Sequence, residues 1–297
     1  MRLSWDDGLR YQLGKMSREE ARFIYDIGYR VVGIGDTLNA TDDDITYARD
    51  VIHEAGLVIG PFWIGHAAFR PDPREHQEHR EAVKTALGIA GKLGCSHLGY
   101  SVGSMSPGGS YYPHPENHTQ KALDILVRHT SELVPYAEDA NVVLCPETTQ
   151  WTIVNCIERM KEFVERVDSP YLRICFDPVN HMTSQRIYES GVFISTAFSF
   201  LGDCIGSIHC KDVNIWNQIV ISHIDEARMG TGLLDHEALI RASSRLEPWK
   251  TFSLEHISDR NLWKPAYDHI QGIAGRIGHT WDDPNLTRDK WLSGKGR

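Results

Sequence analysis

Residues 174–182 read ICFDPVNHM. An apolar run ends on Asp177, and Pro178 follows at once. Because proline lacks a backbone N–H, it ends a central strand. The stretch therefore predicts a short buried strand that finishes on a carboxylate.

Three other apolar runs carry a metal-ligand residue type at or near their ends. VVLCPE ends on Glu147, SIHCKD contains His209, and TFSLE ends on Glu255. Neighbouring members of the set lie about one strand-helix unit apart. A lone acidic residue at a strand end is most often a helix cap or a solvated group, but four such strand ends favour a common site.

The whole chain alternates short β-rich runs with longer amphipathic ones. The expected strands cover residues 2–5, 31–35, 57–65, 97–103, 142–147, 172–177, 207–212 and 251–255. Helical patterns cover residues 73–93, 116–140, 152–167, 236–246 and 264–277, and capping boxes at Ser17 and Thr41 start two more. This α/β order predicts a (β/α)8 TIM barrel. An open doubly wound sheet ranks second, since no GxGxxG follows the first strand.

Length and composition set the domain and partner expectations. We expect one barrel domain over residues 1–280 and a C-terminal tail over 281–297, which forms a surface extension or a subunit contact. A homo-oligomer is expected, with an accessory subunit as an alternative. With 31 basic and 40 acidic residues, no nucleic-acid or membrane partner is expected. The apolar stretch 191–208 is too polar for a membrane span, and the start of the chain has no signal-peptide core, so we expect a cytoplasmic protein with reduced cysteines.

In a barrel, the four ligand-type residues would converge above one mouth, at the carboxyl ends of the strands. Small residues stand two positions before each of them and would leave room above: Cys145, Cys175, Ser207 and Ser253. Three carboxylates at one point raise one another's pKa unless a cation compensates. Three oxygens and one imidazole suit one divalent metal ion, Mn²⁺ first, with Mg²⁺ or Co²⁺ as alternatives.

The motifs FDPVN, HCKD, SLEH and PET resemble those of the xylose isomerase-like TIM barrel superfamily, in particular its sugar (phosphate) isomerase/epimerase branch. EARMGTGLLDHEAL, residues 226–239, is similar to that branch's glycine-rich passage into its last helix. The resemblance implies that Glu147, Asp177, His209 and Glu255 bind one divalent metal. It also implies that Glu147 and Glu255 are the catalytic acid/base pair.

The implied reaction is a sugar isomerisation or epimerisation by proton transfer through a metal-stabilised enediolate. The alternative is a metal-dependent lyase on the same scaffold, such as an inosose-type dehydratase or a carbon-glycoside deglycosidase subunit that acts on 3-keto sugars. A non-catalytic sugar-binding barrel is a third class. The superfamily's DNA-repair branch is disfavoured, because the fourth strand offers no histidine for its zinc ions.

Five residues are expected to bind the sugar or keto-sugar substrate. Asn180 holds the position where family members often carry a histidine, and His181 is then expected to be structural. Lys211 lies two positions after His209, so its side chain is expected to point to the same inner side of the barrel. The remaining candidates follow or end predicted strands: His66, Trp63 and Trp216. Ile215 stands where the epimerases commonly place an arginine, so no known sugar specificity can be carried over.

Overall fold

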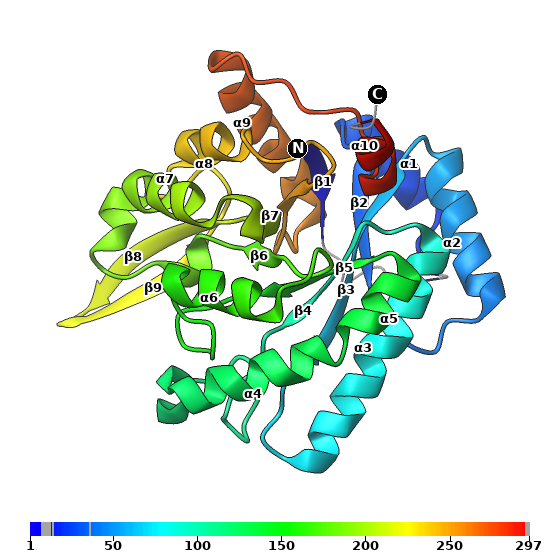
Figure 1. Cartoon of the computed structure of the whole chain (residues 1–297). Coiled ribbons are helices and arrows are strands. Elements are labelled where there is room, and N and C mark those ends of the chain that lie inside the picture. The colour runs from blue at the N-terminus through cyan, green and yellow to red at the C-terminus, as the bar shows by residue number, and fades with distance from the viewer. Residues whose placement is uncertain (7–12, 14, 36, 295–297) are drawn as a thin grey trace.

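The computed structural model describes residues 1–6, 13, 15–35 and 37–294. Eight parallel strands close into a barrel in the order β1-β10-β7-β6-β5-β4-β3-β2 (Figure 1). This finding confirms the predicted (β/α)8 barrel. The barrel strands are β1 (Arg2–Trp5), β2 (Val31–Gly35), β3 (Val58–Ala67), β4 (His97–Ser101), β5 (Val143–Glu147), β6 (Ile174–Phe176), β7 (Ile205–Cys210) and β10 (Thr251–Leu254).

Helices surround the barrel and follow its strands (Figure 1). They are α1 (Arg18–Ile27), α2 (Asp42–Glu54), α3 (Pro73–Leu93), α4 (Gln120–Ser131), α5 (Val134–Ala140), α6 (Ile157–Val167), α7 (Ser190–Leu201), α8 (His236–Ser243), α9 (Trp263–Arg276) and α10 (Arg288–Gly294). The capping boxes predicted at Ser17 and Thr41 are both present. Among the described residues, no helix combines the length and the apolar character that a membrane crossing requires.

The predicted helix over residues 116–140 is divided. A 3-10 turn (Pro115–His118) comes first, and α4 and α5 follow. Pro135 lies in the first turn of α5 and cannot donate a backbone hydrogen bond to the preceding helix. The break therefore falls where proline is tolerated.

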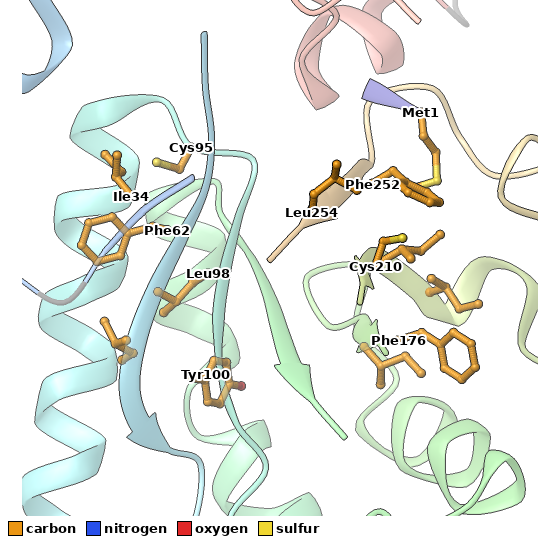
Figure 2. Packing of buried hydrophobic residues seen from close by; sticks show 14 of the residues in the cluster. Met1, Ile34, Phe62, Cys95, Leu98, Tyr100, Phe176, Cys210, Phe252 and Leu254 are labelled. Atoms are coloured by element: carbon orange, nitrogen blue, oxygen red, sulfur yellow. The ribbon is translucent and has the colours of Figure 1, made fainter. Parts of the chain in front are cut away.

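The residues that precede the ligand positions pack outward under the helices, as their alternation predicted. Phe176, Ile208 and Leu254 are fully buried, and Figure 2 shows Phe176 and Leu254 among the core side chains. The ring of Phe176 meets Phe198 of α7 edge-on, with centroids 5.6 Å apart. Inside the barrel, Cys145, Cys175 and Trp63 form a small separate cluster.

A two-stranded hairpin leaves the barrel directly after β7. Its strands are β8 (Asp212–Gln218) and β9 (Ile221–Ala227), which pair antiparallel and extend away from the barrel (Figure 1). The predicted strand over residues 207–212 was therefore wrong at its end, because β7 stops at Cys210. The segment after β9 leads into α8, which is not the last helix of the chain.

The described part of the tail lies across the amino-terminal end of the barrel. Trp281 packs against Phe252, with ring centroids 5.2 Å apart. Arg2 at the start of β1 donates a hydrogen bond to the carbonyl of Pro284 (3.1 Å). The side chain of Asn141, just before β5, bonds to Asp289 of α10. The tail thus covers the end of the barrel opposite the four strand-end residues.

Candidate metal centre and active site

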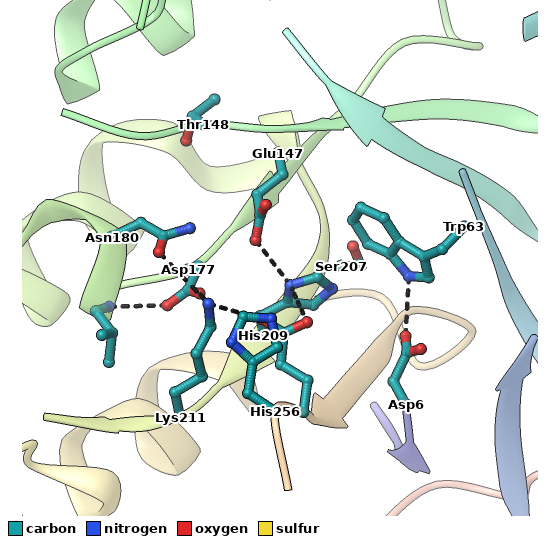
Figure 3. A network of polar contacts seen from close by, with 12 residues as sticks. Asp6, Trp63, Glu147, Thr148, Asp177, Asn180, Ser207, His209, Lys211 and His256 are labelled. Atoms are coloured by element: carbon teal, nitrogen blue, oxygen red, sulfur yellow. Dashed lines mark hydrogen bonds and ion pairs between the residues drawn. The ribbon is translucent and has the colours of Figure 1, made fainter. Parts of the chain in front are cut away.

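The four predicted ligands meet at the carboxyl end of the barrel. Figure 3 shows three of them, Glu147, Asp177 and His209. Glu147 ends β5, Asp177 and Glu255 directly follow β6 and β10, and His209 lies in β7. These strands are neighbours in the barrel. One candidate ligand atom from each residue lies within 4.8 Å of the others. The sequence spacing of about one repeat unit therefore becomes a compact cluster in space.

Hydrogen bonds and ion pairs hold the cluster together. His209 Nδ1 lies 3.0 Å from Glu147 Oε1 and 2.9 Å from Glu255 Oε2. The Lys211 ammonium lies 2.9 Å from Asp177 Oδ2 and 3.0 Å from Glu255 Oε1. The backbone N–H of Val179 donates to Asp177 Oδ1 (2.8 Å), which leaves Oδ2 directed at Lys211. Two cationic side chains thus offset the three carboxylates.

Burial and these neighbours shift the pKa values of the cluster. For Asp177, burial outweighs the attraction of Lys211 and raises the pKa to about 6. Burial also acts against the charge of Glu255, but His209 and Lys211 outweigh it and lower the pKa of that carboxyl. His209 is likewise opposed by burial, yet Cys175 and Glu255 help to raise its pKa well above the ordinary value. The cluster therefore binds protons that a metal ion would have to displace.

The chemistry of these residues fits a divalent cation. Among the described residues, no hydrogen-bond partner reaches the buried His209 Nε2. Asp177 Oδ2 and Glu255 Oε1 share a single ammonium group, that of Lys211. Buried polar atoms without a hydrogen bond are unfavourable unless a charge satisfies them. Three carboxylates and one imidazole form a donor set that hard divalent cations accept. The cluster could therefore hold one metal ion.

A cavity of about 330 Å³ opens above the cluster. Glu147, His209 and Glu255 line it on the ligand side, whereas Asp177 is fully buried behind them. Aromatic side chains form another part of its wall: Trp63, Tyr111 and Trp151. A volume near 300 Å³ is at the lower end of small-molecule sites, and aromatic walls suit the C–H face of a sugar.

Comparison with known proteins gives the family. The sequence profile of the xylose isomerase-like TIM barrel family matches residues 21–273. The chain belongs to this family. By sequence, the chain matches no curated protein.

Several solved structures have a fold similar to that of this barrel. A xylose isomerase-like TIM barrel protein from Mycobacterium smegmatis in complex with magnesium is 13% identical, with a TM-score of 0.70, and the match covers 92% of this chain and 96% of that one. D-psicose 3-epimerase from Clostridium cellulolyticum H10, solved with D-tagatose, is 14% identical, with a TM-score of 0.68 and coverage of 94% and 100%. The probable 3-DHS dehydratase of Bacillus anthracis is 14% identical, with a TM-score of 0.70 and coverage of 91% and 99%. At these identities the similarity establishes the fold.

Three of the five predicted substrate residues line the cavity of this xylose isomerase-like barrel. They are Trp63, Asn180 and Lys211. The indole N–H of Trp63 donates to Asp6 Oδ2 (2.9 Å), and its ring lies 4.5 Å from that of His209. Lys211 Nζ donates to Asn180 Oδ1 at 3.5 Å. These side chains are therefore close to the candidate metal ligands.

The structure does not bring the other two, His66 and Trp216, to the cavity. His66 is half-buried and meets the ring of His79 edge-on. Trp216 lies on β8, where it stacks on His223 and donates a hydrogen bond to Asp225. Trp216 was expected in or next to a loop at the rim, but it lies in the hairpin, which extends away from the barrel. His181 is buried, as expected of a structural residue, with Nε2 3.1 Å from the hydroxyl of Thr148.

Sequence reasoning missed two acidic residues of the site, Asp6 and Glu226, which both line the cavity. The N–H of Asp6 donates to the carbonyl of Leu254 (3.0 Å), so Asp6 occupies the same level of the rim as Glu255. An acidic residue directly after the first strand was the available signal. Glu226 comes from β9 and lies 2.8 Å from His256 Nδ1 and 3.3 Å from Lys211 Nζ. The hairpin was not predicted from the sequence, so there was no reason to place Glu226 at the site.

Proposed function

We propose that the protein is a divalent-metal-dependent sugar isomerase or epimerase that transfers a proton through an enediolate. The observation that carries the proposal is the pair Glu147 and Glu255. Their carboxylates contact the same nitrogen of His209 from two strands that are not neighbours, β5 and β10. Two carboxylates on different sides of one bound sugar can remove a proton from one face and return it to the other.

The residues around the two glutamates keep them in place and ionised. The Tyr111 hydroxyl donates to Glu147 Oε2 (3.1 Å). Burial opposes the charge of Glu147, but His209 outweighs it and lowers the pKa of this carboxyl. Glu147 can therefore act as a base at neutral pH, and Lys211 next to Glu255 can stabilise negative charge on a substrate oxygen.

A divalent ion bound by Glu147, Asp177, His209 and Glu255 would polarise the substrate carbonyl and acidify the neighbouring C–H. We propose Mn²⁺ as this ion, with Mg²⁺ or Co²⁺ as alternatives. The magnesium complex of the Mycobacterium smegmatis protein supports a divalent cation in this fold. The epimerase among the similar structures supports a sugar substrate.

Deuterium exchange tests the proposal. The Mn²⁺-loaded protein is incubated with ketoses and keto-inositols in D₂O, and NMR follows deuterium entry beside the carbonyl. We expect exchange in the wild type and a loss of at least about 10²-fold in Glu147→Gln and Glu255→Gln. Glu237→Gln on the surface of α8 is the matched control. A wild-type protein that binds no divalent metal after dialysis, or exchange that persists in both site variants, would contradict the proposal.

A lyase is the second candidate, because it begins with the same proton abstraction. The Lys211 ammonium borders the cavity and can donate a hydrogen bond to a departing oxygen, and a dehydratase is among the similar structures. The same NMR experiment separates the two reactions. A lyase gives an unsaturated product with an olefinic signal, whereas an epimerase or isomerase gives a saturated sugar.

A further inference from the structure

The β8–β9 hairpin exposes an apolar, uncharged surface away from the barrel (Figure 1). Among the described residues, no large apolar side chain is more exposed than Ile219 and Val220 at its tip, at 92% and 85%. Residues 213–224 contain no Asp, Glu, Lys or Arg, although these types make up 24% of the whole chain. Exposed apolar surfaces of this kind usually mark a site where another molecule binds.

The two outer edges of the hairpin differ in how their backbone groups are satisfied. In an antiparallel pair, alternate residues turn their N–H and C=O groups away from the partner strand. On β8 these residues include Val213 and Ile215, whose N–H groups donate to the side chains of Asp212 and Asn214 (2.9 Å each). The carbonyl of Val213 accepts from the N–H of Leu233 (2.8 Å). The part of β8 near the barrel therefore has a closed outer edge.

The outer edge of β9 is open. The β9 residues opposite the outward-turned residues of β8 are Ser222, Ile224 and Glu226, and they turn their own N–H and C=O groups outward as well. All three residues are exposed, and among the described residues nothing bonds to these backbone groups. The register of the hairpin is regular, and β9 contains no lysine or proline. Because bulges, lysines and prolines are the usual protection of an edge strand, β9 is free to pair with another strand.

The open edge is complementary to a second copy of itself. When two β9 strands pair antiparallel with Ile224 on the twofold axis, the outward groups of Ile224 meet those of its copy. His223 then lies opposite Asp225 of the second copy, so an imidazole faces a carboxylate, and the symmetry repeats this pair. Ile215 and Ile224 share one face of each hairpin, so the four isoleucines form a continuous apolar row. A register centred on Asp225 would instead place two like charges opposite each other.

The charge of the whole chain favours the same surface. Its net charge is −9, so two copies repel each other over most of their surface. The stretch 213–224 carries none of the residues responsible for this charge, and two copies can approach there. A strand of a different protein would find no comparable match of His223 and Asp225.

We propose that two copies of the protein form a symmetric dimer by antiparallel pairing of their β9 strands, with Ile224 on the twofold axis. The two hairpins then form one four-stranded sheet between the barrels. All four candidate metal ligands come from one chain, so the dimer is independent of the proposed reaction. Because the contact is short, we expect a Kd on the order of 10 µM. At micromolar protein concentration such a dimer adds little to the free energy of unfolding.

Analytical ultracentrifugation of the full-length protein, from about 1 to 200 µM, tests the dimer. We expect a monomer–dimer equilibrium for the wild type. Ile224→Pro removes an N–H that points away from β8 and keeps the hydrogen bonds of the hairpin, so the Kd should rise at least about tenfold. Asn217→Pro removes an outward N–H from β8, opposite Ser222, and should keep the wild-type Kd. A wild type that stays monomeric would leave β9 to a strand of another protein and overturn the proposal, as would equal effects of the two proline variants.

Two further variants test the surface and the register, with folding confirmed by circular dichroism. Ile224→Lys keeps the backbone N–H but places two ammonium groups side by side at the axis, so it should also give a monomer. A dimer that survives both Ile224 variants uses another surface, which contradicts the proposal.

A charge exchange fixes the register. His223→Asp alone places carboxylates opposite each other at two positions and should raise the Kd at least about tenfold. Adding Asp225→His restores an imidazole opposite each carboxylate and should return the Kd to near the wild-type value. If the double exchange dimerises no better than His223→Asp, the pairing centred on Ile224 is wrong.

Discussion

At the scale of single residues, Lys211 replaces part of the charge that a metal ion would supply. Its ammonium contacts Asp177 and Glu255 and is itself almost fully buried. Burial acts against its charge, but the neighbouring carboxylates outweigh burial and raise its pKa well above the ordinary value. Removing this cation would take from Asp177 its ion-pair partner and would leave His209 as the nearest cationic group to Glu255.

Lys211→Met should destabilise the metal-free protein by about 3–5 kcal/mol, because breaking one side of a buried ion pair leaves uncompensated charge. Saturating Mn²⁺ should restore much of this loss, since the metal offsets the same carboxylates. Urea unfolding with EDTA and with Mn²⁺ measures both values. Lys264→Met, which removes an exposed pair with Asp268 on α9, should change stability by less than about 1 kcal/mol. An equal loss for Lys211→Met with and without metal would contradict this reasoning.

Asp6 acts through Trp63. Asp6→Ala would leave the buried indole N–H without its acceptor, and we expect a loss of about 1–3 kcal/mol in the free energy of unfolding. Asp6→Asn keeps an oxygen acceptor at the same position, so its free energy of unfolding should fall clearly less than that of Asp6→Ala. Thermal and urea unfolding of both variants gives the comparison. Equal losses would show that the hydrogen bond to Trp63 is not what Asp6 contributes.

Space for this pair depends on two glycines of the flanking strands. A Cβ at Gly33 would lie 2.3 Å from Asp6 Oδ1, and a Cβ at Gly99 would lie 2.3 Å from the ring of Trp63. Neither glycine has an unusual positive φ, so close approach, not backbone conformation, explains why glycine fits there. Strands β2 and β4 thus shape the site without contributing a functional side chain of their own.

At the scale of elements, the eight barrel strands could be predicted from the sequence because each is a short apolar run followed by a polar or helical segment. It missed the β8–β9 hairpin for a physical reason. The turn places Ile219 at a φ of 60°, a conformation for which Gly, Asn or Asp is the usual signal. It also missed α7, because the apolar stretch over residues 191–208 contains a helix and a strand that only Gly202 and a short turn separate.

The outer part of the hairpin should be dispensable for the barrel. Replacing residues 216–223 by Asn-Gly would close a tight turn on the Ile215–Ile224 pair. The base, including Glu226 and its contacts with Lys211 and His256, stays in place. We expect the free energy of unfolding to change by less than about 1 kcal/mol, as measured by urea unfolding, and substrate exchange to persist. A truncated protein that unfolds, or that loses exchange, would show that the tip supports the site.

At the scale of the whole molecule, closure of the barrel is what turns the sequence pattern into a site. Four ligand-type residues spread over more than a third of the chain become neighbours only because β5, β6, β7 and β10 are adjacent in the ring. The pattern could therefore predict the ligand cluster once the fold was chosen. It could not predict the place of Glu226 at the site, because Glu226 belongs to the β8–β9 hairpin and not to a barrel strand.

Metal affinity should rise with pH through the neutral range. Asp177, whose pKa is raised to about 6, must lose its proton before it can bind a cation. His209, whose pKa is raised well above 6.5, must also lose one. Each proton released gives about a tenfold rise in apparent affinity per pH unit below the corresponding pKa. Calorimetry with Mn²⁺ at pH 5.5, 6.5 and 7.5, in two buffers of different ionisation enthalpy, measures affinity and proton release. An affinity that stays constant over this range would contradict the assigned ligands.

The two thiols beneath the ligands, those of Cys145 and Cys175, can report how often the barrel opens. Cys145 and Cys175 are completely buried, and burial raises the pKa of both, that of Cys175 to about 11. They are therefore neutral and shielded from alkylating reagents as long as the barrel stays closed, whereas the partly exposed Cys156 and Cys204 are accessible earlier. The rate at which a maleimide modifies these two cysteines therefore measures how often the barrel mouth opens. An ion or a sugar bound above them would lower this rate.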